Sequence, residues 1–363
     1  MNRPIHGGNL AWAASIAGCP ASSILDFSAS INPLGPPRSA IAAIQAGIPN
    51  LKAYPDPEYR RLRQVLGQMH QLPPEWILPG NGAAELLTWA GRDLARLDVT
   101  YSIAPAFSDY ERSLRAFGGR VESLPLWSEE NWQAVFDRPS HLFPIPPSVS
   151  GKRAGLILNN PHNPTGILWR REDILPDLQR FALVVADEAF MEFLPPDRQE
   201  SLIPVLQQCE NLVVIRSLTK FYSIPGLRLG YAIAHPDRLQ RWQQWRDPWS
   251  VNTLAAAVGE AVIGDTEFEQ QTWNWLSVER ARLLEGFAQL GLRCLKGRAN
   301  FLLVRSPIPS SQLQQILLQR HRILIRDCLS FPELGDRYFR VAVRTQSENQ
   351  RLLDALKELI VDS

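Results

Sequence analysis

The sequence has no excess of charge of either sign. Its 38 lysines and arginines are almost matched by 37 aspartates and glutamates, which gives a formal net charge of +1 over 363 residues. General nucleic-acid binders usually carry a basic excess or stripe, so this balance argues against that class. No apolar run approaches the roughly 18 residues of a membrane-spanning helix, and no basic start followed by an apolar stretch indicates a signal peptide. We therefore expect no nucleic-acid partner and no membrane partner.

Cysteine is also scarce, and the four cysteines are far apart. Cys19, Cys209, Cys294 and Cys328 form no CxxC pair and no spacing typical of a metal site. We therefore expect scattered reduced thiols, no bound metal and a cytoplasmic location. A chain of 363 residues is long enough to bury a large core and to form two domains.

Strand and helix patterns alternate through the middle of the sequence. Strands are expected at residues 99–103, 121–125, 154–158, 183–186 and 212–216. Helices are expected at residues 83–97, 108–117 and 171–180. Several of the strands are continuous apolar runs, which is typical of strands covered on both faces. The alternation predicts an α/β fold with a mostly parallel central sheet and crossover helices.

The two ends of the chain and one internal stretch depart from this alternation. The first 45 residues are rich in loops around a short strand at 24–27, and residues 126–153 hold four prolines that indicate a surface connection. Further elements are expected as a helix at 58–69, a helical region at 252–290, strands at 301–305, 323–326 and 338–343, and helices at 310–319 and the C-terminus. We predict a large domain of residues 46–248 and a smaller α/β domain of residues 1–45 and 249–363.

One lysine stands among small hydroxyl residues directly after a predicted strand. Ser217, Thr219 and Lys220 follow the run 211–216, which is expected to be a buried strand, and Arg228 lies beyond a Pro-Gly turn. Open α/β sheets place their ligand sites at such strand ends. A lysine that forms a Schiff base needs neighbours that lower its pKa and hold an anionic cofactor. The hydroxyl groups and the arginine are suitable donors for a phosphate.

Other polar groups stand at the ends of predicted elements. Asp187 follows the strand at 183–186, where its carboxylate could pair with a protonated pyridine nitrogen or cap a helix. Asn163 lies in the string Asn-Pro-His-Asn-Pro-Thr-Gly, whose residue types also suit a plain turn. The turn Gly-Asn-Gly at 80–82 opens a helix, and the backbone N–H groups of Ala83 and Ala84 at its N-terminus suit a phosphate.

Taken together, these segments resemble the pyridoxal-phosphate (PLP) enzymes of the class I/II aminotransferase family over essentially the whole chain. The resemblance implies the type I fold of PLP enzymes and a homodimer with active sites at the subunit interface. It implies that Lys220 forms the Schiff base, that Asp187 holds the pyridine nitrogen and that Asn163 faces the phenolate oxygen. It assigns the cofactor phosphate to Ser217, Thr219, Arg228 and the backbone of Ala83 and Ala84.

The resemblance also assigns roles to aromatic residues. Tyr110 would stack on the cofactor ring, with Phe107 as the second choice, and Tyr54 would reach the cofactor phosphate of the partner subunit. Phe190 stands where histidinol-phosphate aminotransferases often have a tyrosine, so the phenolate oxygen has one donor fewer. Three tryptophans could pack a domain junction or a subunit contact, and the sequence does not decide between these: Trp242, Trp245 and Trp249.

Two subfamilies of this family compete, namely threonine-phosphate decarboxylases of cobalamin biosynthesis and histidinol-phosphate aminotransferases, and Phe190 favours the former. Both act on a phosphorylated amine, and both match the arginine pair Arg326 and Arg340. The planar guanidinium fork suits carboxylate and phosphate groups. By resemblance, Arg340 binds the substrate carboxylate and Arg326 the substrate phosphate, whereas the nearby Arg344 is expected to be structural.

The N-terminal segment favours the decarboxylases. The string His-Gly-Gly-Asn at residues 6–9 and the stretch 25–35 resemble the decarboxylase opening, and the aminotransferases usually lack the first string. We expect His6, Gly7 and Asn32 to contact the substrate together with Asn163.

The expected activity is the PLP-dependent decarboxylation of L-threonine O-3-phosphate to (R)-1-amino-2-propanol O-2-phosphate, which supplies the aminopropanol linker of cobalamin. One alternative is a histidinol-phosphate aminotransferase. The other is a binding protein with this fold and no catalysis. The retained Lys220, Asp187, Asn163 and Arg228 argue against the second alternative, because a protein without chemistry has no need of all four.

Overall fold

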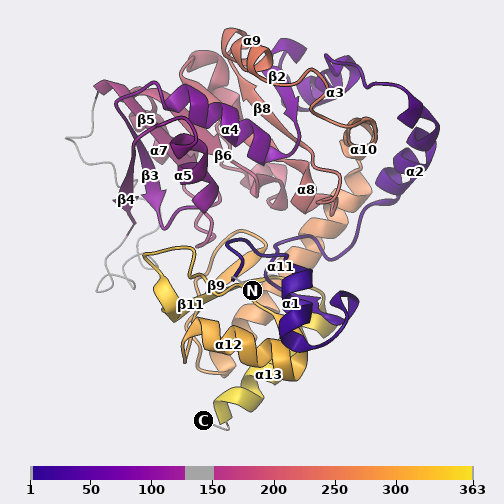
Figure 1. Cartoon of the computed structure of the whole chain (residues 1–363), viewed down its shortest axis with the longest axis vertical. Helices are drawn as coiled ribbons and strands as arrows, with labels where there is room; N and C mark the ends of the chain where they lie inside the picture. The colour runs from indigo at the N-terminus through magenta and orange to yellow at the C-terminus, as the bar shows by residue number, and fades with distance from the viewer. Residues whose placement is uncertain (1–2, 127–150, 362–363) are drawn as a thin grey trace.

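The computed structural model describes residues 3–126 and 151–361, and a seven-stranded sheet forms its upper part (Figure 1). The strand order is β2-β8-β7-β6-β5-β3-β4, and neighbouring strands are parallel except where β8 pairs with β7 and β2. The strands are β2 Ile77–Gly80, β3 Val99–Ala104, β4 Val121–Pro125, β5 Gly151–Asn159, β6 Phe181–Asp187, β7 Leu212–Ser217 and β8 Gly230–Ala234. The predicted α/β fold with a mostly parallel sheet is confirmed.

The central strands are buried on both faces. Along β6, Val184 and Ala186 belong to one hydrophobic cluster, whereas Leu183 and Val185 belong to a second. Successive side chains of a strand point to opposite faces, so each cluster covers one face of the sheet. The helices of the upper part are α2 Arg38–Gly47, α3 Arg60–His70, α4 Ala83–Leu94, α5 Ser108–Arg115, α7 Arg171–Leu178, α8 Leu218–Phe221, α9 Pro236–Trp245 and α10 Thr253–Val262.

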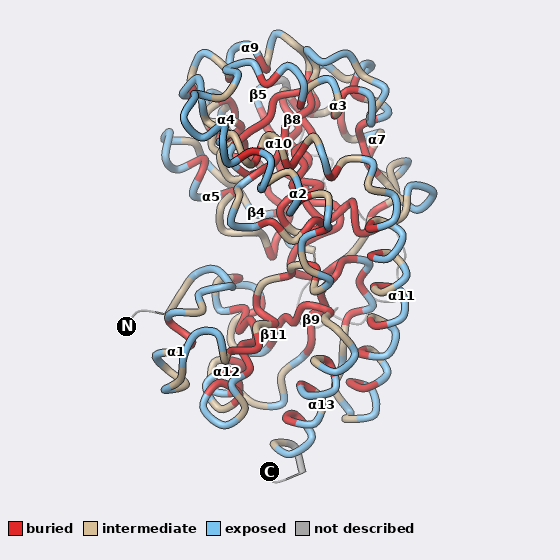
Figure 2. The backbone as a smooth tube through the Cα atoms, turned by 90° about the vertical axis from the view of Figure 1, so that its right-hand side faces the viewer, coloured by how far each residue is buried: buried red, intermediate tan, exposed pale blue. Residues whose placement is uncertain are grey.

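The lower part of the molecule is built from both ends of the chain (Figure 1). Two short sheets form there, β1 paired in parallel with β10 and β9 paired antiparallel with β11. Their strands are β1 Leu25–Asp26, β10 Ile323–Leu324, β9 Phe301–Arg305 and β11 Tyr338–Ala342. The helices are α1 Leu10–Ala17, α11 Thr266–Gln289, α12 Ser310–Ile316 and α13 Gln346–Val361. Figure 2 shows that α11 runs along one side of the molecule, with its outer surface exposed and its inner surface buried.

Short single-turn elements connect the longer ones. They are the 3-10 helices η1 Ala21–Ser23, η2 Ile48–Lys52, η3 Pro74–Trp76, η5 Met191–Phe193, η6 Pro196–Arg198, η7 Ile203–Gln208 and η9 Gly335–Arg337, and the π-helix η8 Leu317–His321. Within the described ranges, no helix is long and apolar enough to cross a membrane.

Several element boundaries differ from the sequence predictions. The helical region expected at 252–290 is two helices, because Gly264 has a φ of +83° and the Asp265 side chain caps α11 by accepting from the Phe268 N–H. The strand β5 begins at Gly151, inside the stretch expected to be a connection, and the rest of that stretch, residues 127–150, lies outside the described residues. The strand expected at 323–326 is regular only at its first two residues.

The three tryptophans without a predicted role lie in different surroundings. Trp242 is buried and donates to the Asp93 carboxylate. Trp245 lies under the guanidinium group of Arg92, whose Cζ is 4.3 Å from its ring. Trp249 is 45% exposed and stacks on Tyr54, with ring centroids 4.4 Å apart. They therefore do not act as one packing unit.

Candidate active site

The strands β5, β6 and β7 end side by side at one cavity. Their register aligns Asn159 with Asp187 and Asp187 with Ile215. Since parallel strands present their carboxyl ends at one edge, the loops that follow them converge there. The cavity has a volume of about 230 Å³. It brings together seven of the predicted site residues: His6, Gly7, Asn163, Asp187, Lys220, Arg326 and Arg340.

Lys220 lies in the single turn of α8, directly after β7. Burial lowers the pKa of its ammonium group; Asp187 opposes this shift, whereas the positive charge of Arg340 adds to it. Its Nζ lies 4.7 Å from the ring centroid of Phe190. The phenylalanine therefore forms an apolar wall beside the amine at the position where related aminotransferases often carry a hydroxyl.

Asp187 ends β6 and is buried with both carboxylate oxygens bonded. Oδ1 accepts from the backbone N–H of Ala189 at 3.0 Å, and Oδ2 accepts from the Tyr110 hydroxyl at 2.7 Å. Burial raises the pKa of Asp187, and the Tyr110 hydrogen bond opposes that shift. Tyr110 thus helps to keep the carboxylate ionised inside the protein.

The expected stacking role of Tyr110 is not supported by this geometry. Tyr110 is not among the cavity-lining residues; it lies in the first turn of α5 and packs in the core beneath the cavity. Phe107, the second choice, precedes α5 and lines the cavity. Phe107 is the N-cap residue of α5, with an extended backbone, and its ring packs edge-on against Tyr110 with centroids 5.6 Å apart. Of these two neighbouring rings only Phe107 lines the cavity, so it is the better candidate for the ring contact.

Hydroxyl groups, a helix N-terminus and an arginine form a phosphate cradle. The Ser217 and Thr219 hydroxyl oxygens lie 2.8 Å apart. The helix α4 starts with Ala83 and Ala84, and Gly82 before it has a φ of +74°. A Cβ at Gly82 would collide with the guanidinium group of Arg228, so the missing side chain allows Arg228 to lie against this helix start. Ser217 pairs with Gly230 on β8, and a Cβ at Gly230 would lie 2.7 Å from the Ala83 nitrogen, so the strand end that carries the hydroxyls adjoins the start of α4.

Arg340 and Arg326 meet at the opposite side of the cavity. The two residues form an antiparallel bridge through their backbones, at 3.0 and 2.7 Å. The Arg340 side chain is buried and donates to the Asn163 side chain and to the Ser28 carbonyl, at 3.2 Å for the latter. Within the described ranges, Arg340 has no carboxylate within 4.0 Å, and its Nε has no hydrogen-bond partner. Burial lowers the pKa of Arg340 to about 10. A buried cation without a carboxylate partner is unfavourable, and a bound anion would stabilise it.

The N-terminal arm, residues 3–9, lies across these arginines. Arg326 donates to the backbone carbonyls of Pro4, at 3.3 Å, and of Ile5, and also to the Ser330 hydroxyl. Arg3 pairs with Asp327 at 3.3 Å. These contacts bring His6 to the cavity, where its ring centroid is 5.6 Å from that of Phe107.

Asn32 does not reach the cavity, contrary to the expected substrate contact. Its amide nitrogen donates to the Phe221 carbonyl at 2.9 Å and to the Thr272 hydroxyl at 2.8 Å. Its backbone N–H donates to the Lys220 carbonyl at 3.0 Å. The polar groups of Asn32 are thus used within the protein, and we assign it the role of positioning α8 and Lys220.

Tyr54 is 79% exposed and lies outside the cavity of its own chain. The structure describes one chain, so the contact expected with a partner subunit stays a prediction. Arg344 donates to the Asp26 carbonyl and to Glu348, at 3.0 and 2.9 Å, which agrees with a structural role.

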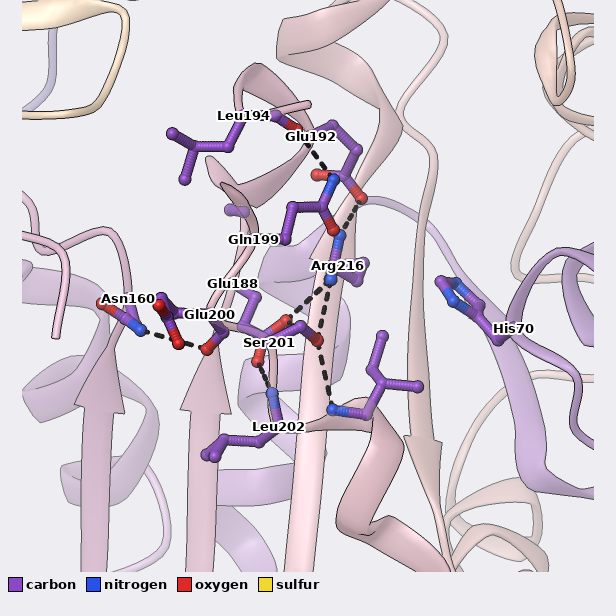
Figure 3. A network of polar contacts seen from close by, with 12 residues as sticks. His70, Asn160, Glu188, Glu192, Leu194, Gln199, Glu200, Ser201, Leu202 and Arg216 are labelled. Atoms are coloured by element: carbon purple, nitrogen blue, oxygen red, sulfur yellow. Dashed lines mark hydrogen bonds and ion pairs between the residues drawn. The ribbon is translucent and has the colours of Figure 1, made fainter. Parts of the chain in front are cut away.

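A buried ion-pair network joins the segment after β6 to the end of β7 (Figure 3). Arg216 donates to Glu188 and Glu192, at 2.9 and 2.7 Å. Glu188 follows Asp187 and Arg216 precedes Ser217, so side-chain alternation points each pair to opposite faces. Removing one member of a buried pair costs about 3–5 kcal/mol, so the network holds the strand ends that carry Asp187 and Ser217. The sequence analysis did not predict this network, although Glu188 and Arg216 are the direct neighbours of the predicted site residues Asp187 and Ser217.

Comparisons with known proteins agree with this geometry. The family model for aminotransferases of class I and II matches residues 22–356. The chain belongs to this family. It is 39% identical to the threonine-phosphate decarboxylase of Salmonella typhimurium, over 98% of this chain and 96% of that protein. It is 35% identical to a histidinol-phosphate aminotransferase of Symbiobacterium thermophilum, over 90% and 88%. The crystal structure of the histidinol-phosphate aminotransferase from Clostridium acetobutylicum has a TM-score of 0.81 at 29% identity, over 94% of this chain and all of that one.

In this aminotransferase-family site, the Tyr110→Phe variant tests the bond to Asp187. Without the hydroxyl, the pKa of Asp187 rises further, so the carboxylate loses its charge at a higher pH as the solution is acidified. We expect kcat to fall about tenfold, equivalent to about 1.4 kcal/mol, and the acid limb of the pH–rate profile to shift upward. Tyr101→Phe, on the neighbouring strand β3, is the control; an unshifted acid limb in Tyr110→Phe would show that the bond does not matter.

Proposed function

We propose that this protein is a PLP-dependent decarboxylase that converts L-threonine O-3-phosphate to (R)-1-amino-2-propanol O-2-phosphate for the cobalamin linker. The single observation that carries the proposal is the meeting of Arg340, Arg326 and the arm residue His6 beside Lys220 in one cavity. A substrate with both a carboxylate and a phosphate supplies an anion for each arginine. The relative from Salmonella typhimurium bears the name of this activity.

The cavity and its surroundings fit PLP. The cofactor phosphate would lie at the start of α4, where Arg228 has no carboxylate within 4.0 Å among the described residues. Asp187 would accept from the pyridine nitrogen, Asn163 would face the phenolate oxygen, and Lys220 would hold the cofactor covalently. When bound, PLP stabilises the negative charge that forms on Cα as a bond to it breaks.

The choice of that bond depends on how the protein orients the substrate. Arg326 would bind the phosphate beside Ser330, while Arg340 and His6 would hold the carboxylate, so these residues would decide which bond to Cα is weakened. Lys220 Nζ would deliver the proton that replaces the departing carboxylate on Cα.

The experiment that tests this function is CO₂ release from L-threonine O-3-phosphate by the purified, PLP-loaded protein without a keto acid. We expect stoichiometric CO₂ and an aminopropanol phosphate product. Absence of CO₂, with amino transfer from glutamate to imidazole acetol phosphate, would instead establish a histidinol-phosphate aminotransferase.

Substitutions in the N-terminal arm are expected to weaken the binding and turnover of the substrate and to leave the binding of the cofactor unchanged. His6→Ala should lower kcat/KM about tenfold, which corresponds to one lost polar contact of about 1.4 kcal/mol, while PLP affinity stays unchanged. Gly7→Ala should raise KM, because a Cβ there would collide with the Ser28 carbonyl and displace the arm. His235→Ala, far from the cavity, is the control for the loss of an imidazole. An unchanged kcat/KM in His6→Ala would remove His6 from the mechanism.

We also propose a cytoplasmic homodimer in which Tyr54 reaches the partner's site. Large apolar side chains are exposed around Tyr54, among them Leu51 at 58% and Trp249 at 45%, and such patches mark interaction surfaces. Leu51→Asp should give a particle of 40.9 kDa by light scattering, in contrast to twice that mass for the unchanged protein. Equal masses for both would contradict this interface.

The four cysteines are unpaired, which suits a reducing compartment. The division into residues 46–248 and 1–45 plus 249–363 stays a prediction.

A further inference from the structure

A second cavity, of about 390 Å³, lies between the segment after β6 and the outer side of α11. One part of its surface is apolar, and the other carries three arginines from three separate segments. The apolar part is formed by Phe193, Leu194, Pro195, Pro196, Trp273 and Leu276. The arginines are Arg198, Arg280 and Arg298. We call this cavity the arginine groove.

Positive charge in the arginine groove is poorly compensated. Arg280 is partly buried, and within the described ranges the only hydrogen bond of its guanidinium group goes to the Arg298 carbonyl, at 2.7 Å. Burial lowers the pKa of Arg280, and the charges of Arg298 and Arg198 lower it further. The one acidic residue of the lining is Asp197, whose side chain is 77% exposed and 3.9 Å from Arg198.

Acidic residues next to the groove have other partners. Glu279, which precedes Arg280 on α11, accepts from Arg282 at 2.6 Å and from Asn349 at 3.2 Å. Glu192 is bonded to Arg216 on the inner side. Three like charges around one cavity repel one another unless an anion lies between them.

We propose that the arginine groove binds an organic phosphate, with the phosphate group between the three arginines and the organic part against the apolar wall. Guanidinium groups bind phosphate oxygens through paired hydrogen bonds. The Nε1 group of Trp273 is already used in a 2.8 Å hydrogen bond to the Glu192 carbonyl. Trp273 can therefore meet the organic part of the ligand only with the apolar surface of its ring. This site is separate from the catalytic cavity and does not depend on the proposed reaction.

The groove is linked to the active site through one loop. The backbone N–H of Arg298 donates to the Gly166 carbonyl at 2.6 Å. Gly297 packs so closely on Gly166 that a Cβ there would lie 2.8 Å from the Gly166 Cα. Gly166 ends the loop that presents Asn163 to Arg340. A ligand that holds Arg298 therefore acts on the loop that shapes the substrate site, and we expect it to change KM.

The test is calorimetric titration of the PLP-loaded protein with phenyl phosphate. The unchanged protein should show a binding event that Arg280→Gln weakens about tenfold, since one charge-assisted contact is lost. Arg351→Gln, which removes an exposed arginine from α13 outside the groove, should bind like the unchanged protein. Arg298→Gln serves as the second variant if Arg280→Gln is poorly folded. Each variant keeps the catalytic arginines, so phosphate binding at the active site is the same in all.

Two outcomes would overturn the proposal. Equal isotherms for the unchanged protein, Arg280→Gln and Arg298→Gln would show that the groove binds no phosphate. Equal affinity for inorganic phosphate and phenyl phosphate in the Arg280-dependent event would show that the apolar wall takes no part and would reject an organic ligand. Loss of CO₂ release in the unchanged protein would leave these isotherms unaffected, so the two proposals fail separately.

Discussion

Replacing Lys220 by alanine is expected to abolish the visible absorbance of the lysine-bound cofactor and to lower kcat by about 10³-fold or more. The structure places this amine beside Asp187 and the apolar ring of Phe190. Burial lowers the pKa of Lys220, so a larger fraction is neutral and able to form a covalent bond at neutral pH. Absorbance spectroscopy and borohydride reduction followed by peptide mass analysis measure the loss directly.

The control for Lys220→Ala is Lys52→Ala, which removes an exposed lysine from η2. It should keep both the absorbance and the activity. A borohydride-reducible band that persists in Lys220→Ala would assign the covalent bond to another lysine. Such a result would overturn the central role of α8 in the proposed site.

Replacing Arg340 by methionine is expected to remove most of the activity while the protein stays folded and loaded with cofactor. Truncating one partner of a buried charge pair costs about 2–5 kcal/mol, equivalent to about 30- to 5,000-fold in kcat/KM. Methionine keeps the length of the side chain and removes a buried cation that has no carboxylate partner among the described residues. Methionine cannot form the hydrogen bonds to Asn163 and Ser28, but it also removes the free-energy cost of keeping an unpaired cation out of water. Because these two effects offset each other, we expect the unfolding temperature to fall by no more than about 4 °C.

Arg305→Met is the matched control for Arg340→Met. Arg305 lies on the paired strand β9, opposite Tyr338, and is exposed. Its kcat/KM should remain close to that of the unchanged protein. Full activity of Arg340→Met on L-threonine O-3-phosphate would show that the substrate carboxylate binds elsewhere.

The sheet and the cofactor residues could be predicted because their signals are local. The runs 183–186 and 212–215 are apolar throughout, which is how strands buried on both faces appear in a sequence. Asp187 and Ser217 come at the ends of these runs, so their meeting follows from the parallel arrangement alone. Lys220 follows from the same rule, three residues after Ser217.

Roles that depend on side-chain direction could not be predicted in the same way. Phe107 and Tyr110 are both aromatic and three residues apart, and only the start of α5 decides which lines the cavity and which bonds to Asp187. Asn32 belongs to a motif shared with decarboxylases, yet its amide is used by Phe221 and Thr272. Sequence spacing carries no information on these partners, which lie far away along the chain.

The sequence by itself determined the α/β class and the family, because periodicity and motifs are properties of neighbouring residues. Only the tertiary structure decided that Arg326 bonds to the N-terminal arm beside Arg340 in one cavity, and that Arg280, Arg298 and Arg198 surround one groove. The physical reason is that charge compensation depends on distance in space. A buried arginine is recognised as an anion site only once the surrounding carboxylates have been placed, and their positions come from packing between distant segments.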